Sequence, residues 1–143
     1  MKIDFSSVEV REFEPLPTGR YLAKLTTTDY IEASSRSGEP AVAWQFTVDG
    51  GEYDGRKAFL NTSLQPQSLW STQRILTALG MTKEEIDALE WDTENPEGIQ
   101  STLNELLEAS CVIVIGHEKY EGTKRQRVRQ VLSAEGVSAE ASF

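Results

Sequence analysis

Apolar and polar residues alternate in the first half of the chain, and this alternation predicts β-strands. Successive side chains of a strand point to opposite faces, so Tyr21, Ala23 and Leu25 fall on one face of an extended segment. The alternation is clearest after the turn 34–40, which is rich in Ser and Gly and ends in Pro. The pattern predicts strands over 20–30, 41–48 and 56–63.

The period changes to that of a helix after the third strand. Gly80 stands where a glycine closes many helices, and Thr82 with Glu85 predicts a capping box for a second helix. A third short helix is expected near 99–107. Trp70 lies beside the apolar stripe of the first helix and is expected to pack in the interior. That stripe consists of Leu69, Thr72, Leu76 and Leu79.

Two further strands, 110–117 and 124–132, follow the helical region and are joined by a turn at 121–123. The predicted order, in which three strands are followed by helices and then by two more strands, is that of an oligonucleotide/oligosaccharide-binding (OB) fold. We therefore expect a mainly β protein with a five-stranded OB-fold-like barrel and helices between strands 3 and 4. A β-sandwich fragment or an unrelated α+β fold would give the same order. The predicted parts are an N-terminal arm (1–15), an OB-fold-like domain (16–132) with a helical insertion (about 66–108), and a disordered acidic tail (133–143).

The composition fits a small domain of a reducing compartment. The length of 143 residues suits one domain, and the single cysteine, Cys111, excludes an internal disulfide framework. The longest apolar run, 111–115, is far shorter than the roughly 20 residues that span a bilayer. The first five residues contain no apolar stretch of signal-peptide length. These features predict a soluble, cytoplasmic protein that does not associate with a membrane.

The formal net charge of −9 argues against nucleic acid, because the summed field repels phosphates. The charges are segregated, however. The segment 83–108 holds nine carboxylates and one lysine, whereas 117–131 holds five basic residues and two carboxylates. One face of the molecule could therefore be basic although the whole chain is acidic.

The sequence contains no recognisable active site. His117 is the only histidine, and together with Cys111 it cannot supply the four ligands of a structural zinc site. Neither a phosphate-binding P-loop nor a dinucleotide fingerprint is present. Carboxylate pairs such as Glu84 and Glu85 fit a solvated helix surface better than acid–base chemistry. We therefore expect no enzyme activity, no cofactor and no metal.

The basic hairpin is the most informative charged segment. Arg125, Arg127 and Arg129 occupy alternate positions, which a strand places on one face about 6.6 Å apart at roughly 3.3 Å per residue. This spacing is close to the phosphate repeat of an extended single strand, and arginine also stacks on bases. Lys124 and Lys119 add charge to the same hairpin. The alternative is a solvated outer face that carboxylates of the helical insertion neutralise.

Aromatic side chains near the basic residues favour single-strand binding, because such proteins combine a basic groove with rings on which bases stack. Tyr53, Phe59 and Tyr120 could either stack on bases or pack in the core. Arg56 and Lys57 lie close to the first two of these rings in the sequence. By contrast, Trp44 and Phe46 share a strand face with valines, which predicts that they pack in the core.

The chain ends in a short, weakly acidic segment with a terminal phenylalanine. A terminal Phe143 offers an apolar ring together with a carboxylate, which suits a pocket with a basic rim. The segment could therefore recruit a protein partner, or it could be no more than the end of the chain.

Several stretches resemble a family of small bacteriophage single-stranded DNA-binding proteins that are encoded beside phage recombination and replication genes. They are LPTGRY (16–21), AVAWQF (41–46), GEYDGRK (51–57) with Asn61, SLW (68–70) with Leu76 and ALG (78–80), and HEKYEG (117–122). The resemblance covers roughly 16–132 and implies an OB barrel that binds single-stranded DNA. The tail resembles the Phe-ended tails of replication single-strand binders, which implies phage recombinase or replication proteins as partners.

The sequence thus predicts a non-catalytic, phage single-stranded DNA-binding protein of recombination or replication. The alternative is a phage protein-interaction module that binds a host protein through an acidic helical face formed by Glu84, Glu85, Asp87, Glu90 and Asp92. Whether the protein forms a homo-oligomer is left open by the sequence.

Overall fold

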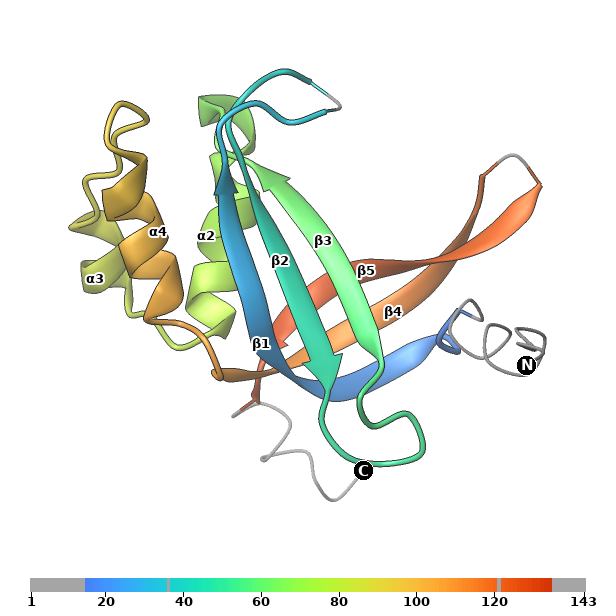
Figure 1. Cartoon of the computed structure of the whole chain (residues 1–143). Helices are drawn as coiled ribbons and strands as arrows, with labels where there is room; N and C mark the ends of the chain where they lie inside the picture. Colours follow the sequence, from blue (N-terminus) through green and yellow to red (C-terminus); the bar gives the residue numbers. More distant parts are fainter. Residues whose placement is uncertain (1–14, 36, 121, 135–143) are drawn as a thin grey trace, which may run out of the picture.

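The computed structural model describes residues 15–35, 37–120 and 122–134, apart from the side chain of Tyr120 (Figure 1). Its strands are β1 (Gly19–Ile31), β2 (Ala41–Val48), β3 (Lys57–Ser63), β4 (Ser110–Tyr120) and β5 (Thr123–Ser133). Between β3 and β4 lie the 3-10 helix η1 (Pro66–Ser68) and the helices α2 (Leu69–Ala78), α3 (Lys83–Asp87) and α4 (Pro96–Asn104). The predicted order of strands and helices is confirmed.

The five strands form one antiparallel sheet in the order β3-β2-β1-β4-β5. The central strand β1 is 13 residues long and pairs with β4 over 19–24 and with β2 over 23–31. Its register with β2 shifts between Leu25 and Thr27, and such a bulge bends a strand and increases its twist. The sheet curls around this bend, so that its two edge strands, β3 and β5, contact each other (Figure 1).

The edge strands meet through side chains. The amide of Gln126 on β5 donates to the backbone oxygen of Lys57 at 3.0 Å and accepts from the backbone N–H of Leu16 at 2.9 Å. One side chain therefore joins β5 both to the start of β3 and to the segment before β1. Within the described ranges no backbone ladder connects β3 with β5. The fold is mainly β with helices between the third and fourth strands, as predicted, but its sheet is open and not a closed barrel.

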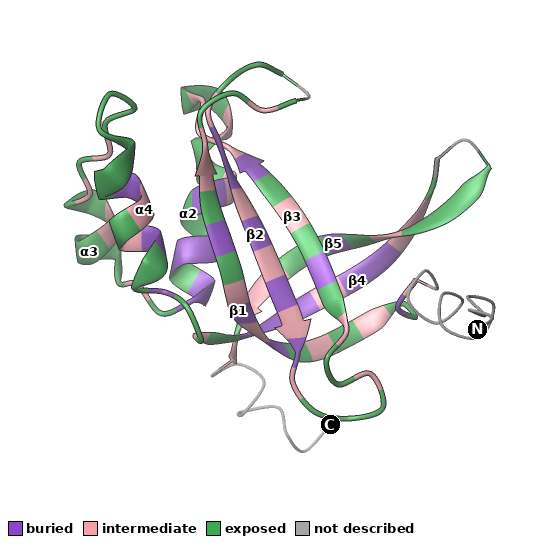
Figure 2. Cartoon of the chain, viewed as in Figure 1, coloured by how far each residue is buried: buried purple, intermediate pink, exposed green. Residues whose placement is uncertain are grey.

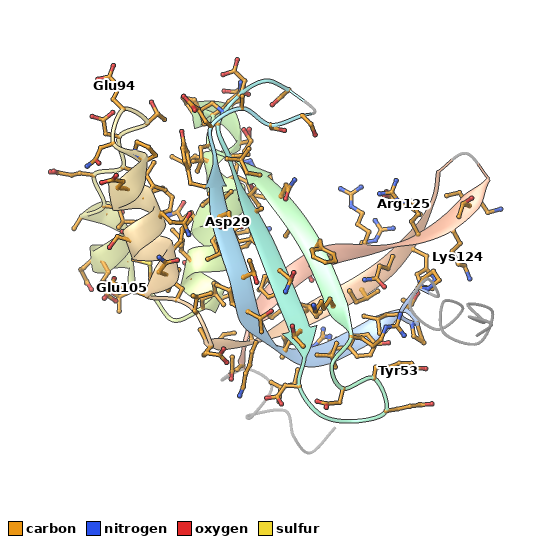
Figure 3. The ribbon with its side chains drawn as sticks, in the orientation of Figure 1. Asp29, Tyr53, Glu94, Glu105, Lys124 and Arg125 are labelled. Carbon is orange, nitrogen blue, oxygen red and sulfur yellow. The ribbon has the colours of Figure 1, made fainter. Side chains whose placement is uncertain are left out.

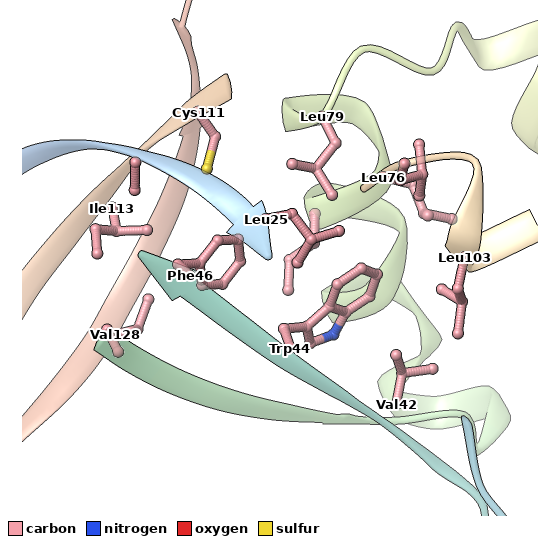
Figure 4. Close-up of a cluster of buried hydrophobic side chains, with 14 of the residues drawn as sticks. Leu25, Val42, Trp44, Phe46, Leu76, Leu79, Leu103, Cys111, Ile113 and Val128 are labelled. Atoms are coloured by element: carbon pink, nitrogen blue, oxygen red, sulfur yellow. The ribbon is translucent and has the colours of Figure 1, made fainter. Parts of the chain in front are cut away.

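One face of the sheet and the helices α2 and α4 enclose the apolar core (Figure 4). Buried positions alternate with half-buried ones along β2 and with exposed or half-buried ones along β3, as Figure 2 shows. Trp44 and Phe46 have exposed fractions of 1% and 0%, which confirms their predicted place in the core. Leu76 of α2 and Leu103 of α4 pack against the same cluster. Burial of this apolar surface is the main force that holds the helices on the sheet.

A chain of buried hydrogen bonds fixes α2 on β3. The hydroxyl oxygen of Thr62 accepts from the indole Nε1 of Trp44 at 2.9 Å and from the hydroxyl of Thr72 at 2.8 Å. Thr62 and Thr72 are both buried, and buried polar groups without partners are costly. The three residues come from β3, β2 and α2, so their bonds specify where the helix sits relative to the sheet.

Helix α4 covers the part of β1 that has a strand on only one side. The amide of Gln100 accepts from the backbone N–H of Tyr30 and donates to the backbone oxygen of Thr28, both at 2.8 Å. These bonds replace ladder bonds on a strand edge that would otherwise be open to pairing with another chain. The covered edge faces the helical side of the molecule and not the basic hairpin.

The third helix differs from its predicted bounds. The third was expected near 99–107, but α4 begins at Pro96, a residue type suited to the first turn of a helix. The capping box of Thr82 and Glu85 is confirmed, although α3 is only five residues long. In the part of the chain that the structure describes, no helix is long and apolar enough to cross a membrane.

Candidate nucleic-acid interface

The β4–β5 hairpin places its basic side chains on the surface. Arg125 lies opposite Glu118 and Arg127 opposite Gly116 in the ladder, and both arginines are exposed. Lys119 and Lys124 face each other directly near the turn, where like charges repel. Such a pair of lysines favours the approach of an anion.

Arg129 departs from the predicted alternation. The ladder shifts between Val114 and Ile115, which pair with Gln130 and Val128, so Arg129 is the unpaired residue of a bulge. Its side chain stays exposed and lies across Gly116, where an added Cβ would stand 2.3 Å from the Arg129 Nε. Its Nη2 also donates to the backbone oxygen of His117 at 3.1 Å. The absence of a side chain at Gly116 therefore allows the position of Arg129.

Arg127 has an acidic neighbour within the hairpin. Its Nη1 lies 3.1 Å from Oε2 of Glu118, and the two side chains are 56% and 40% exposed. An ion pair this open contributes only about 0–1 kcal/mol, so a phosphate could replace the carboxylate at little cost. In the alternative considered from the sequence, carboxylates of the helical insertion neutralise the arginines, whereas the carboxylate beside Arg127 comes from β4.

The candidates on β3 share its outer face. Lys57 and Phe59 are exposed, Phe59 to 64%, and Asn61 follows them two positions further on. Phe59 lies opposite Gln45 of β2, with none of the core residues on its face of the strand. Because Gln126 bonds the backbone oxygen of Lys57, this end of β3 lies directly against β5. Phe59 is therefore an open aromatic side chain on the strand that faces the hairpin.

Tyr53 is held by packing. It is half-buried in the turn before β3, and its ring meets the ring of Tyr21 edge-on, with centroids 5.9 Å apart. The hydroxyl of Tyr21 donates to the backbone oxygen of Pro17, and burial is the first cause that raises the pKa of this phenol. Arg56, in the same turn, is half-buried. Tyr53 thus has a packing role, on the side of the molecule that also carries Lys124 and Arg125 (Figure 3).

A groove of about 730 Å³ runs between β3, α2 and β5. It brings together residues that are more than 50 positions apart in the sequence, because α2 contacts both edge strands. Three arginines line it, and the described residues of its wall include no carboxylate. The charged and aromatic residues of the wall are Trp70, Arg74, Arg127 and Arg129.

Two members of this wall, Trp70 and Arg74, were missed by reasoning from the sequence. Trp70 was expected to pack in the interior, but its side chain is 57% exposed. The predicted stripe was also wrong at Leu69, which is 46% exposed, because the core contacts of α2 come from the turn that carries Thr72 and Ile75. Arg74 could have been noticed, since it is the only basic residue of α2.

A family model described as "Protein of unknown function (DUF669)" matches residues 3–95. The chain belongs to the DUF669 family. The matched segment includes β1 to β3, α2 and α3, and hence Phe59, Trp70 and Arg74. It ends before α4, so the arginines of β5 lie outside it. No curated protein matches this chain.

Elsewhere in the DUF669 chain, the two residues considered for metal binding, Cys111 and His117, are engaged in the fold itself. Cys111 is buried, and burial raises the pKa of its thiol to about 12, which keeps it protonated. The Nε2 of His117 is hydrogen-bonded to the backbone oxygen of Leu16. Among the described residues there is no group of three or more His, Cys, Asp or Glu placed to hold a metal ion.

Two predicted contacts cannot be placed. The backbone of Tyr120 ends β4, but its side chain lies outside the described residues. Phe143, the predicted partner-binding residue, also lies outside them, as do residues 1–14 of the predicted N-terminal arm. Their roles stay predictions.

Proposed function

We propose that this DUF669 protein binds single-stranded DNA without catalysis and acts in phage DNA recombination or replication, in the cytoplasm of the host cell. The observation that carries this proposal is the groove between β3, α2 and β5, with three arginines and no carboxylate among its described wall residues. Phosphates of a flexible strand would bind along β5, and bases would face the exposed rings beside it.

The strand connections support an OB-like fold. OB-folds are five-stranded, partly open Greek-key barrels that bind oligonucleotides on strands 2 and 3 and the adjoining loops. Here β1 pairs with both β2 and β4, the edge strands β3 and β5 touch, and the helices come between β3 and β4. We infer that this open sheet is an OB barrel closed by the Gln126 side chain instead of a ladder. In such a barrel, β3 and the hairpin would flank the ligand.

The overall acidity of the chain is compatible with DNA binding because the charges lie apart. Glu94 and Glu105 project from the α3–α4 side, whereas Lys124 and Arg125 project from the hairpin at the opposite side (Figure 3). Exposed charges separated by more than about 8–10 Å are largely screened at physiological salt. A strand on the hairpin would therefore experience mainly the local arginines and lysines.

A titration with single-stranded and double-stranded oligonucleotides tests the proposal. Each phosphate neutralised on a single strand contributes about −0.7 to the slope of log affinity against log salt. Contacts from the three arginines of β5, Arg125, Arg127 and Arg129, therefore predict a slope of about −2, and tighter binding of the single strand than of the duplex. Failure of the wild-type protein to bind the single strand at low salt would contradict the proposal, as would stronger binding of the duplex.

The alternative, a protein-interaction module with an acidic docking face, has less support. Glu85 belongs to the capping box, where its carboxylate accepts from the backbone N–H of Thr82 at 2.9 Å. Lys83 pairs with Asp87 at 2.6 Å on the same short helix. Two of the five carboxylates of the predicted face are thus engaged within α3, which gives them a local structural role.

A further inference from the structure

Trp70 is a large aromatic side chain held at the surface in the wall of the basic groove. Tryptophan is highly buried on average, yet this side chain is 57% exposed on the first turn of α2. It shares the groove wall with Arg127 and Arg129 of β5. The helix therefore places an open indole on the same groove as two arginines of another element.

One contact touches the Trp70 ring itself, and a second fixes the helical turn that carries it. The guanidinium carbon of Arg74, one turn further along α2, lies 5.2 Å from the ring centroid, which is a cation–π distance. The turn that carries both residues is fixed to β3 by the Thr72–Thr62 hydrogen bond. An indole restrained in this way loses little conformational entropy when a ligand stacks on it.

The groove offers two kinds of surface to a ligand. One wall is aromatic and cationic through Trp70 and Arg74, and the β5 wall carries Arg127 and Arg129. Leu60 and Val131 add apolar surface to the groove wall. The volume of about 730 Å³ falls in the range of about 300–1,000 Å³ that is typical of small-ligand sites. A flat ring joined to a phosphate matches both surfaces.

We infer that this groove holds one unpaired nucleotide of the bound strand, with its base stacked on Trp70 and a phosphate beside Arg127 and Arg129. The inference rests on the proposed function and extends it from the hairpin onto α2. The bound strand then leaves β5 and crosses the start of the helix. In a duplex, neighbouring base pairs cover both faces of each base, so the site selects single strands.

Tryptophan fluorescence tests this inference directly. Trp44 is 1% exposed and Trp91 is half-buried, so a stacked base acts mainly on the emission of Trp70. An oligothymidylate should quench the wild-type protein, and an abasic oligomer of the same length should bind through its phosphates with little quenching. Trp70→Leu should weaken oligothymidylate binding by about 5- to 150-fold. Trp70→Phe, which keeps a ring, should retain most of the affinity.

Leu69→Ala is the matched control, because Leu69 is exposed on the same turn but does not line the groove. It should bind like the wild type, and thermal melts should show Trp70→Leu folded. The salt slope should stay unchanged in Trp70→Leu, because the indole contacts no phosphate. Wild-type affinity in Trp70→Leu, with salt-dependent binding intact, would overturn the inference and leave the proposed function standing. A wild-type protein that binds no single strand would remove both.

Discussion

The hairpin side and the α3–α4 side of the molecule carry opposite charges, and the charged side chains of the two sides have different surroundings. On the α3–α4 side, the charges of α3 serve the helix itself, as the capping box of Glu85 and the Lys83–Asp87 pair show. On the hairpin side, Arg129 occupies a bulge and lies across a glycine, and Arg127 lines a groove. Arg127 and Arg129 also have partners within the hairpin, Glu118 and the backbone oxygen of His117, but they line a groove as well. Arginines gathered around a groove favour an anionic ligand.

The largest expected effect comes from removing the arginines of β5. The triple change of Arg125, Arg127 and Arg129 to Ala should flatten the salt slope of oligonucleotide binding by about two units. If the plots of log affinity against log salt for the wild type and the variant meet near 1 M salt, the affinity of the variant is about 100-fold lower at 0.1 M salt. Titrations at several salt concentrations measure both quantities.

A matched triple change on the other side provides the control. Glu84, Glu94 and Glu105 are exposed carboxylates of the α3–α4 side, and their replacement by Gln changes the net charge by the same amount with the opposite sign. This variant should keep the wild-type slope. A gain of affinity in this variant that mirrors the loss in the arginine variant would mean that net charge, and not the hairpin, determines binding.

A smaller effect is expected from Gly116→Ala. The new Cβ would stand 2.3 Å from Nε of Arg129, so this flexible side chain must move away. The affinity for single-stranded DNA should fall by up to about tenfold, the equivalent of one charge-assisted contact of roughly 1.4 kcal/mol. Arg129→Ala is the comparison, and the double variant should bind no more weakly than Arg129→Ala alone. Additive losses would show that Gly116 acts on binding by another route.

The attachment of α2 to the sheet can be weakened without touching the groove. Thr72→Val keeps the shape of the side chain and removes the hydroxyl that donates to Thr62. The loss of this buried hydrogen bond should lower the free energy of unfolding by about 1 kcal/mol. Urea denaturation measures the loss, and Thr77→Val, an exposed position of the same helix, serves as the control. Equal stability of both variants would contradict the role given to the Thr62 network.

The smallest effect concerns pH on the acidic side. Hydrogen bonds from the backbone and side chain of Thr82 lower the pKa of Glu85 below its ordinary value of 4.5. A lowered pKa in the folded state stabilises the protein above the ordinary value, and this contribution is lost as the pH falls through the folded-state pKa. Glu85→Gln keeps the capping box but cannot titrate, so its stability should fall less below pH 4.5. Thermal melts of the wild type and of Glu85→Gln between neutral and acidic pH measure this difference. If the melting temperatures of the two proteins fall in parallel, the carboxylate has no such role.

The alternation of apolar and polar residues predicted the strands well, because it can be seen within each segment of the sequence on its own. The strand 41–48 and its buried Trp44 and Phe46 are confirmed, and so is the capping box of Thr82 and Glu85. These features depend on neighbours in the sequence, which the pattern contains.

The groove could not be predicted because it depends on contacts between distant segments. Trp70 sits beside an apolar stripe, and the period of α2 gives no sign that the side chains of its first turn are exposed. The bulge at Arg129 follows from the register of β5 against β4, which alternation along one strand does not reveal. The arginines were therefore identified by residue type, but their meeting with Trp70 and Arg74 appeared only in the fold.

Mapping of backbone amide NMR shifts during titration with a short oligothymidylate tests the central claim most directly, because it compares both sides of the molecule at once. The account predicts that the largest shifts fall on β5, on the start of α2 and on the outer face of β3, and that α3 and α4 stay unperturbed. Shifts that cluster on α3 and α4, or the absence of shifts on β5 at saturating oligonucleotide, would contradict it.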